Sequence, residues 1–186
     1  MADSRWSIEK VALLKLKTLF LLTLLLSHGT QPVIAVAQQP DSRSVIAALN
    51  YNFAKYADWP GEEHAESIRL CYFTHTFKNS FTELHDKAIF DKPISTHQIN
   101  DVEQTDQCHL VYIDRNERDI TQRLFVYLAD KPVLTVSDIS GFIDDGGMIE
   151  IVREDNKFRF KVNMSRMELA NLKMSSQVLK LAVEVK

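Results

Sequence analysis

The sequence predicts an α/β domain of the Rossmann-like kind: a three-layer sandwich with a mostly parallel sheet, a C-terminal antiparallel hairpin and flanking helices. Three apolar runs, at 68–73, 108–113 and 132–137, have the length and continuous hydrophobicity of buried parallel strands. Between them, at 79–88 and 115–129, apolar residues recur at helical spacing. Such alternation of strand and helix is typical of a parallel sheet with helices packed on its faces and right-handed crossovers.

The first 37 residues are expected to be a cleaved secretory signal rather than part of the fold. Lys10, Lys15 and Lys17 precede an apolar run at 18–26, and Ala35-Val36-Ala37 offers a small-x-small cleavage site. An uncleaved membrane anchor is the alternative, but the apolar run is about half as long as the roughly 20 residues that a spanning helix needs. We therefore expect export to the periplasm through a signal peptide at 1–37.

The mature chain, expected to begin at Gln38, has the composition of one domain with a sizeable core. Of the 186 residues of the whole sequence, 45% are hydrophobic and 25% are charged. The net charge of -3 gives no basic surface that would indicate binding to nucleic acid. We expect a short linker at 38–43 and a single domain at 44–186.

An amphipathic helix at 44–59 is expected to open the domain. Pro60 lacks a backbone donor and disfavours helical geometry in the residue before it, so the helix should end at Trp59. The apolar face of this helix is rich in aromatic residues: it carries Val45, Leu49, Phe53, Tyr56 and Trp59. Core packing explains such a face, and so does a surface that binds a partner or a small ligand. In the second case Tyr51, Tyr56 and Trp59 are the candidate contact residues.

Further elements complete the sheet and its covering helices. A short edge strand is expected at 95–99. Alternating apolar and polar residues at 148–152 and 158–162 predict the antiparallel hairpin. Apolar residues at helical spacing predict a final helix at 165–183, which the pair Ser175-Ser176 could divide into two pieces.

Export changes the interpretation of the two cysteines. Cys71 and Cys108 both lie in the mature chain, and an even number of cysteines in an oxidising compartment favours a disulfide between them. A metal site is the alternative, because His75 and His109 are near the cysteines in sequence. The spacings Cys-x3-His and Cys-His are poor matches to zinc sites, so we favour the disulfide and expect no bound metal.

The sequence offers no pattern typical of an enzyme, and we expect no catalytic residues. The chain lacks a Gly-x-Ser-x-Gly motif, and residues 74–77 contain no glycine for a phosphate-binding loop, so no cofactor is expected. Asp144 and Asp145 precede two glycines and are explained by a tight turn. An exported hydrolase is the least favoured interpretation.

Seven segments occur in a recognisable order along the mature chain. They are FAKYADWP at 53–60, IRLC at 68–71, CHLVYI at 108–113, PVLTVSD at 132–138, GGMI at 146–149, FKVN at 160–163 and SSQVLKLA at 175–182. None of them is a catalytic motif. As a set they resemble the YfiR family of exported proteins, which includes HmsC-like members.

The resemblance implies a regulatory protein. Known members of the family are periplasmic repressors that bind the periplasmic sensor domain of a membrane-bound diguanylate cyclase, and their release raises cyclic di-GMP and promotes biofilm formation. The redox state of the family's disulfide has been linked to that control, and the shared pair matches Cys71 and Cys108. The best-known member has a second cysteine pair in its C-terminal half, which this sequence lacks.

Two hypotheses of different class follow. The first is a regulator that docks on an inner-membrane diguanylate cyclase or a related signalling protein, with Arg166 and Lys173 as polar contacts beside the aromatic candidates. A homodimer is compatible with this hypothesis. The second is a small-molecule binding module without a cyclase partner, whose pocket lies at the carboxyl ends of the parallel strands and is lined by Thr74, Asp114 and Ser137.

Overall fold

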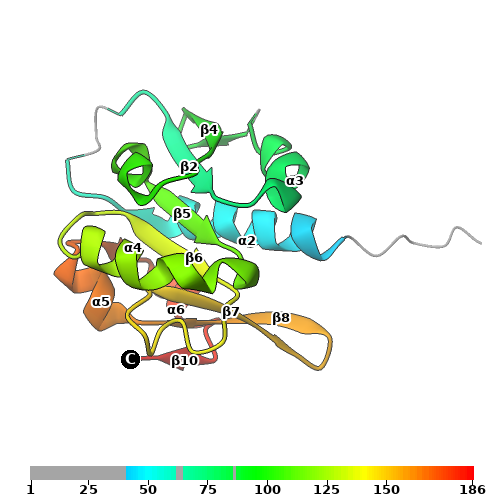
Figure 1. The fold of residues 1–186 in the computed structure, drawn as a ribbon, viewed down its shortest axis with the longest axis vertical. Coiled ribbons are helices and arrows are strands. Elements are labelled where there is room, and N and C mark those ends of the chain that lie inside the picture. The colour runs from blue at the N-terminus through cyan, green and yellow to red at the C-terminus, as the bar shows by residue number, and fades with distance from the viewer. Residues whose placement is uncertain (1–40, 62–64, 86) are drawn as a thin grey trace, which may run out of the picture. The chain divides into compact units, whose positions relative to one another are not determined.

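A mixed sheet lies at the centre of the computed structural model, which describes residues 41–61, 65–85 and 87–186. Its strands are β2 (Ile68–Tyr72), β3 (Ala88–Ile89), β4 (Lys92–Gln98), β5 (Leu110–Ile113), β6 (Leu134–Ser137), β7 (Ile149–Glu154), β8 (Lys157–Val162) and β10 (Glu184–Val185). Across the sheet these eight strands of the described residues follow the order β10-β8-β7-β6-β5-β2-β4-β3 (Figure 1).

The sheet is parallel in its middle and antiparallel near its ends. Strands β4, β2, β5, β6 and β7 pair parallel with one another, whereas β7 with β8 and β4 with β3 pair antiparallel. The edge strand β10 pairs parallel with β8. From β2 the chain passes to β4 on one side and then returns to β5 on the other, so the strand order reverses between β2 and β5. The predicted α/β fold with a mostly parallel sheet and a C-terminal hairpin is confirmed.

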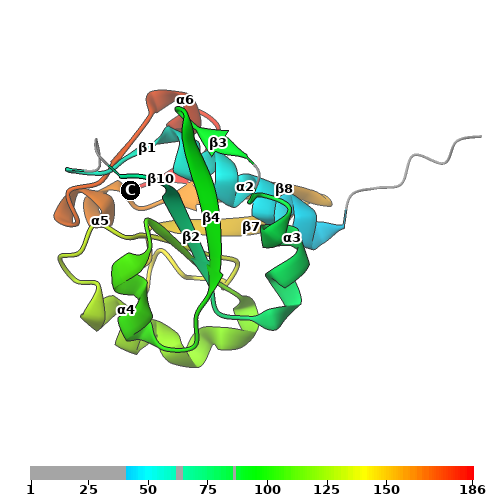
Figure 2. The ribbon, with the colours of Figure 1, turned by 90° about the horizontal axis from the view of Figure 1, so that it is seen from above.

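Helices cover both faces of the sheet. They are α2 (Ser42–Tyr56), η2 (His75–Phe77), α3 (Lys78–Thr82), η3 (Val102–Gln107), η4 (Arg115–Ile120), α4 (Thr121–Tyr127), α5 (Met164–Leu169) and α6 (Ser176–Leu179). Figure 2 shows α4 and α2 on opposite sides of the strands. The order of strand, helix and strand therefore produces the three layers that the sequence predicts.

Alternation along the central strands divides the core into two apolar clusters. In β2, Leu70 and Tyr72 belong to the cluster that includes residues of α2, α3, α5 and α6. Cys71 and Phe73 point to the opposite side and join Leu124 of α4. Because successive side chains of a strand face opposite ways, a strand with apolar residues on both faces, such as this one, must be covered on both.

The opening helix ends at Tyr56, three residues before the predicted end at Trp59. Ala57 is already extended, with φ -88° and ψ 154°. It belongs to a short strand, β1 (Ala57–Asp58), which pairs antiparallel with β9 (Lys173–Met174). The predicted boundary is wrong because this distant pairing draws the chain out of the helix before the proline does.

The final helix predicted at 165–183 is also wrong, although α6 does begin at the predicted division, Ser175-Ser176. This region forms α5, β9, α6 and the edge strand β10, and Asn171 takes the left-handed conformation with φ 56° between the first two. A left-handed residue cannot continue an α-helix, so the helix ends before Asn171 although the apolar residues keep their helical spacing beyond it. Ser175 begins α6 by accepting a hydrogen bond from the amide of Gln177.

Three other boundaries differ from the prediction, and one turn explains the hairpin. Helix α3 is shorter than the predicted 79–88, and the 115–129 helix divides into η4 and α4. The edge strand predicted at 95–99 is β4, which begins at Lys92, ends at Gln98 and lies inside β3 in the sheet. Asp155 and Asn156 form the two-residue turn that joins β7 to β8, and both have positive φ. Positive φ at both positions is what a turn needs in order to match the twist of the two strands.

No helix within the described residues is long and apolar enough to cross a membrane. The signal predicted at 1–37 lies outside the described residues.

Candidate functional site

The three polar residues predicted to line a pocket at the carboxyl ends of the strands each stabilise a local turn. Thr74 Oγ1 accepts a hydrogen bond from the amide of Thr76 at 3.3 Å. Asp114 caps η4 by accepting from the amide of Asn116 at 3.0 Å. Ser137 joins the end of β5 to the loop after β6, donating to one carbonyl oxygen at 2.7 Å and accepting from one amide at 3.0 Å. Their polar groups are thus used within the fold.

An ion pair that the sequence did not single out lies at the same edge of the sheet. Asp138 accepts a hydrogen bond from the Tyr112 hydroxyl at 3.1 Å and pairs with the Arg115 guanidinium at 2.6 Å, and its side chain is only 4% exposed. Burial, followed by the Asp138 charge, raises the pKa of Tyr112. The hydrogen bond that the Arg115 guanidinium donates to Asp138 raises the pKa of Arg115. The position of Asp138 directly after a buried strand was the only signal for it.

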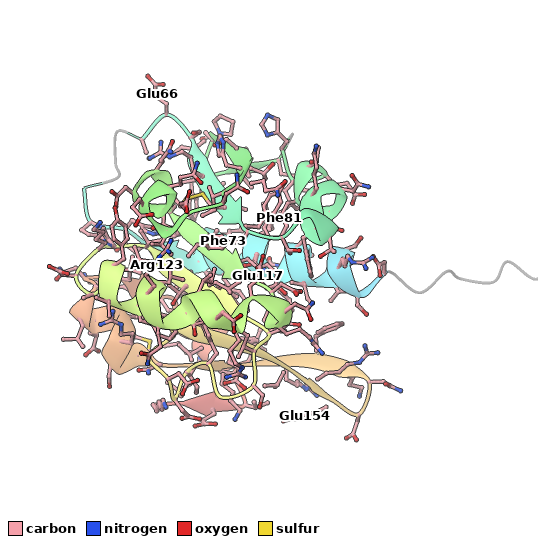
Figure 3. The ribbon with its side chains drawn as sticks, in the orientation of Figure 1. Glu66, Phe73, Phe81, Glu117, Arg123 and Glu154 are labelled. Atoms are coloured by element: carbon pink, nitrogen blue, oxygen red, sulfur yellow. A yellow bond between two sulfur atoms is a disulfide. The ribbon has the colours of Figure 1, made fainter. Side chains whose placement is uncertain are left out.

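Aromatic rings pack beside this ion pair, near the point where the strand order reverses. The Phe77 ring lies 4.9 Å from that of Tyr112, and Phe81, labelled in Figure 3, lies 5.9 Å from it between ring centroids. In open α/β sheets this crevice is the usual ligand site. Here the packed aromatic rings and the hydrogen bonds to Asp138 lie around this crevice. The small-ligand site at Thr74, Asp114 and Ser137 stays a prediction.

Hollows open at the other end of the sheet, where the parallel strands begin. The first, of about 220 Å³, lies between the end of α2, the start of β2 and the β3–β4 hairpin. The second, of about 380 Å³, adjoins it and reaches the start of α6. The third, of about 230 Å³, lies at the starts of β5 and β6 and is lined in part by Arg69, Cys108 and Lys131.

Trp59 forms a wall of both the first and the third hollow. Its indole Nε1 donates to the carbonyl oxygen of His109 at 3.0 Å, and its ring meets the imidazole edge-on at 5.6 Å between centroids. Only 9% of Trp59 is exposed, and it belongs to the apolar core. Of the two interpretations of the aromatic face, core packing is the one that the structure shows for Trp59.

The other two aromatic candidates are half-buried on α2. The Tyr51 hydroxyl donates to the carbonyl oxygen of Ala88 at 3.2 Å, and the Lys87 ammonium lies 5.6 Å from the Tyr51 ring centroid. Tyr51 therefore holds the edge strand β3 against α2. Tyr56 lines the second hollow. A partner-binding role for either residue stays a prediction.

The two polar candidates differ in what they contact. The Arg166 guanidinium donates to the carbonyl oxygens of Phe125 and Leu128 at 3.5 and 3.4 Å, so it ties α5 to the end of α4. Lys173 is exposed on β9, opposite Asp58 of β1. Lys173 is thus the more accessible of the two for a contact with another protein.

The predicted disulfide is present between Cys71 and Cys108, whose Cα atoms lie 5.9 Å apart. Cys71 is in β2, and Cys108 immediately follows η3, on the face of the sheet that α4 covers. The bridge therefore fastens η3 to the central strand. Across the residues that the structure describes, no three His, Cys, Asp or Glu side chains are grouped to bind a metal ion.

The fold and its single bridge define a small α/β domain stabilised by a disulfide within its core. A family model described as YfiR/HmsC-like matches residues 43–183, most of the sequence, and the chain belongs to this family. Proteins of the family are regulators rather than enzymes, and membership suggests a role in the periplasmic regulation of diguanylate cyclase signalling.

A solved structure shows a similar fold in a distant protein. A conserved domain protein from Vibrio cholerae O1 biovar El Tor superposes with a TM-score of 0.53 at 9% sequence identity, over 78% of this chain and 60% of that one. A domain from Streptococcus pneumoniae, described as an ABC domain in complex with L-tryptophan, gives a TM-score of 0.47 at 12% identity over 75% of this chain and 60% of that one. This chain thus spans less than two thirds of either protein. No curated protein sequence matches the chain.

Proposed function

We propose that the protein is a periplasmic repressor that binds the periplasmic domain of a membrane-bound diguanylate cyclase and holds the enzyme inactive. The observation that carries the proposal is the family match over residues 43–183. The Cys71–Cys108 bridge supports the location, because disulfides persist in oxidising compartments such as the periplasm. Release of the repressor would raise cyclic di-GMP and favour biofilm formation.

Deleting the gene tests the proposal in the cell. Cyclic di-GMP and biofilm mass should rise, and expression of the wild-type protein in the periplasm should return both to their starting values. Capture of the mature protein from membranes, followed by identification of the bound inner-membrane protein, should recover a diguanylate cyclase. Unchanged cyclic di-GMP in the deletion strain, with the captured cyclase expressed, would rule the proposal out.

A surface variant separates binding from folding. Lys173 is exposed on β9, and Lys173→Glu reverses its charge without disturbing the core. If Lys173 contacts the cyclase, the variant should be exported and folded but should fail to lower cyclic di-GMP. Arg159→Glu on β8 makes the same change in charge at another exposed position and is the matched control. Equal repression by both variants would exclude Lys173 from the interface.

A further inference from the structure

The third hollow, of about 230 Å³, is built on one row of residues from three neighbouring strands. The row consists of Arg69 in β2, His109 just before β5 and Val133 just before β6. The residue that follows each of them is paired in register with its neighbours, and the backbone ladder continues through His109. Because residues at one register position point to the same face of a sheet, the three side chains lie side by side along the hollow.

Segments on either side of this row close the hollow. Asp106 and Cys108 come from the end of η3, and Lys131 and Pro132 come from the segment between α4 and β6. The ring of Trp59 completes the lining. The hollow thus combines apolar surface with three charged side chains that come from three different parts of the chain.

The charges that line the hollow leave one positive charge in excess. The Asp106 carboxylate accepts hydrogen bonds from the Lys131 ammonium and the Tyr127 hydroxyl, both at 2.6 Å. The hydrogen bond from Lys131 lowers the pKa of Asp106, so the two opposite charges balance each other. The Arg69 guanidinium donates through Nε to the carbonyl oxygen of Gln107, and no carboxylate of the described residues pairs with it.

His109 adds no further charge. Its Nδ1 accepts a hydrogen bond from the backbone amide of Arg69 at 3.0 Å. A protonated imidazole carries a hydrogen on both nitrogen atoms and could not accept this bond, so the ring is neutral. The excess charge is therefore that of Arg69 alone.

We propose that the third hollow binds a small organic monoanion, in which a carboxylate group is attached to an apolar body. A guanidinium binds a carboxylate through two parallel hydrogen bonds, and the two terminal nitrogen atoms of Arg69 supply them because its Nε is already bonded. The apolar body packs against Trp59 and Val133. One excess positive charge matches a monoanion, whereas the second charge of a phosphate would meet the Asp106 carboxylate.

This site is distinct from the pocket predicted at Thr74, Asp114 and Ser137, which lies at the opposite ends of the strands. Binding is a property of the isolated protein, so its test does not depend on the cyclase that we propose as partner. A ligand here would give the regulator a small-molecule input.

Titration of the mature, oxidised protein with benzoate at constant ionic strength tests the site. Trp59 lines the hollow and is the only tryptophan after position 37, so its fluorescence reports binding. Benzoate should give a saturable change. Benzamide has the same shape without the charge and should bind at least ten-fold more weakly, because a hydrogen bond to a charged group is the stronger one. Inorganic phosphate should also bind more weakly than benzoate.

Three variants locate the binding site. Arg69→Gln should raise the Kd for benzoate by roughly ten-fold or more. Lys92→Gln is the matched control, because Lys92 lines the first hollow, which Trp59 also lines, but not the third. It should leave the Kd unchanged. Asp106→Asn removes the negative charge but keeps an acceptor oxygen, and it should lower the Kd by about two- to five-fold. Misfolding cannot produce such a gain in affinity.

Several results would overturn the proposal. They are the absence of saturable benzoate binding, equally tight binding of benzamide, and an unchanged Kd in Arg69→Gln. A higher Kd in Lys92→Gln with none in Arg69→Gln would place the ligand in the first hollow and would also overturn it.

Discussion

Removing the disulfide should cost the domain a large fraction of its stability. In the double variant Cys71→Ala/Cys108→Ala, the unfolded chain regains the freedom of a closed loop with a sequence separation of 37 residues. The loop-closure model gives roughly 13 cal/mol/K for that loop, or about 4 kcal/mol at 25 °C. Both sulfur atoms lie in the apolar cluster under α4, so a smaller loss of packing adds to this value.

Urea unfolding followed by tryptophan fluorescence measures the effect. Trp59 is the only tryptophan after position 37, and it contacts His109, the neighbour of Cys108. With a slope of about 2 kcal/mol/M, a loss of about 4 kcal/mol lowers the urea midpoint by about 2 M. A reducing agent should lower the midpoint of the wild-type protein by a similar amount and leave that of the double variant unchanged. If the oxidised wild type and the double variant unfold at the same urea concentration, the bridge does not constrain the chain as argued.

Three further substitutions test individual contacts. Within the described residues, the buried Asn50 Oδ1 has no hydrogen-bond partner. Asn50→Leu should therefore leave the free energy of unfolding unchanged or raise it by up to about 1 kcal/mol. A clearly lower temperature of thermal unfolding would contradict this. Tyr51→Phe removes the hydrogen bond to the Ala88 carbonyl oxygen and should lower the free energy of unfolding by roughly 0.5–1.5 kcal/mol. Faster amide hydrogen exchange in β3 and β4, but not in β7, would show that the loss is local to this contact. Burial raises the pKa of Glu117, so its ionisation opposes folding at pH values above its unfolded pKa. Glu117→Gln should therefore stabilise the protein more at pH 7 than at pH 4, and an equal effect at both would refute the assignment.

The central strands could be predicted from the sequence because burial on both faces leaves a continuous apolar run. The runs at 68–73, 108–113 and 132–137 contain β2, β5 and β6, and each run has side chains in both apolar clusters. The hairpin around Asp155 and Asn156 could be predicted equally well, because its turn residues and the alternation of apolar and polar residues in its two strands both indicate a hairpin. These signals are local, and they survive in any chain that forms such a sheet.

The C-terminal segment could not be predicted in the same way. Its apolar residues recur at helical spacing, yet three of them serve different elements: Met167 in α5, Met174 in β9 and Val178 in α6. Strands β9 and β10 have two residues each, too few for an alternating pattern to be recognised. They form because β1 and β8 offer free edges far away in sequence, which is a tertiary effect.

The same tertiary effect decides why Trp59 is a core residue. A helix continued to position 59 would have set Trp59 on the aromatic face of α2, whereas the extended residues Ala57 and Asp58 carry its ring across to His109. Trp59 then lines both the first and the third hollow, so a substitution at Trp59 would disturb the core and the hydrogen bond to His109 together with both hollows. For this reason a change at Trp59 cannot separate a binding role of the hollows from the stability of the fold.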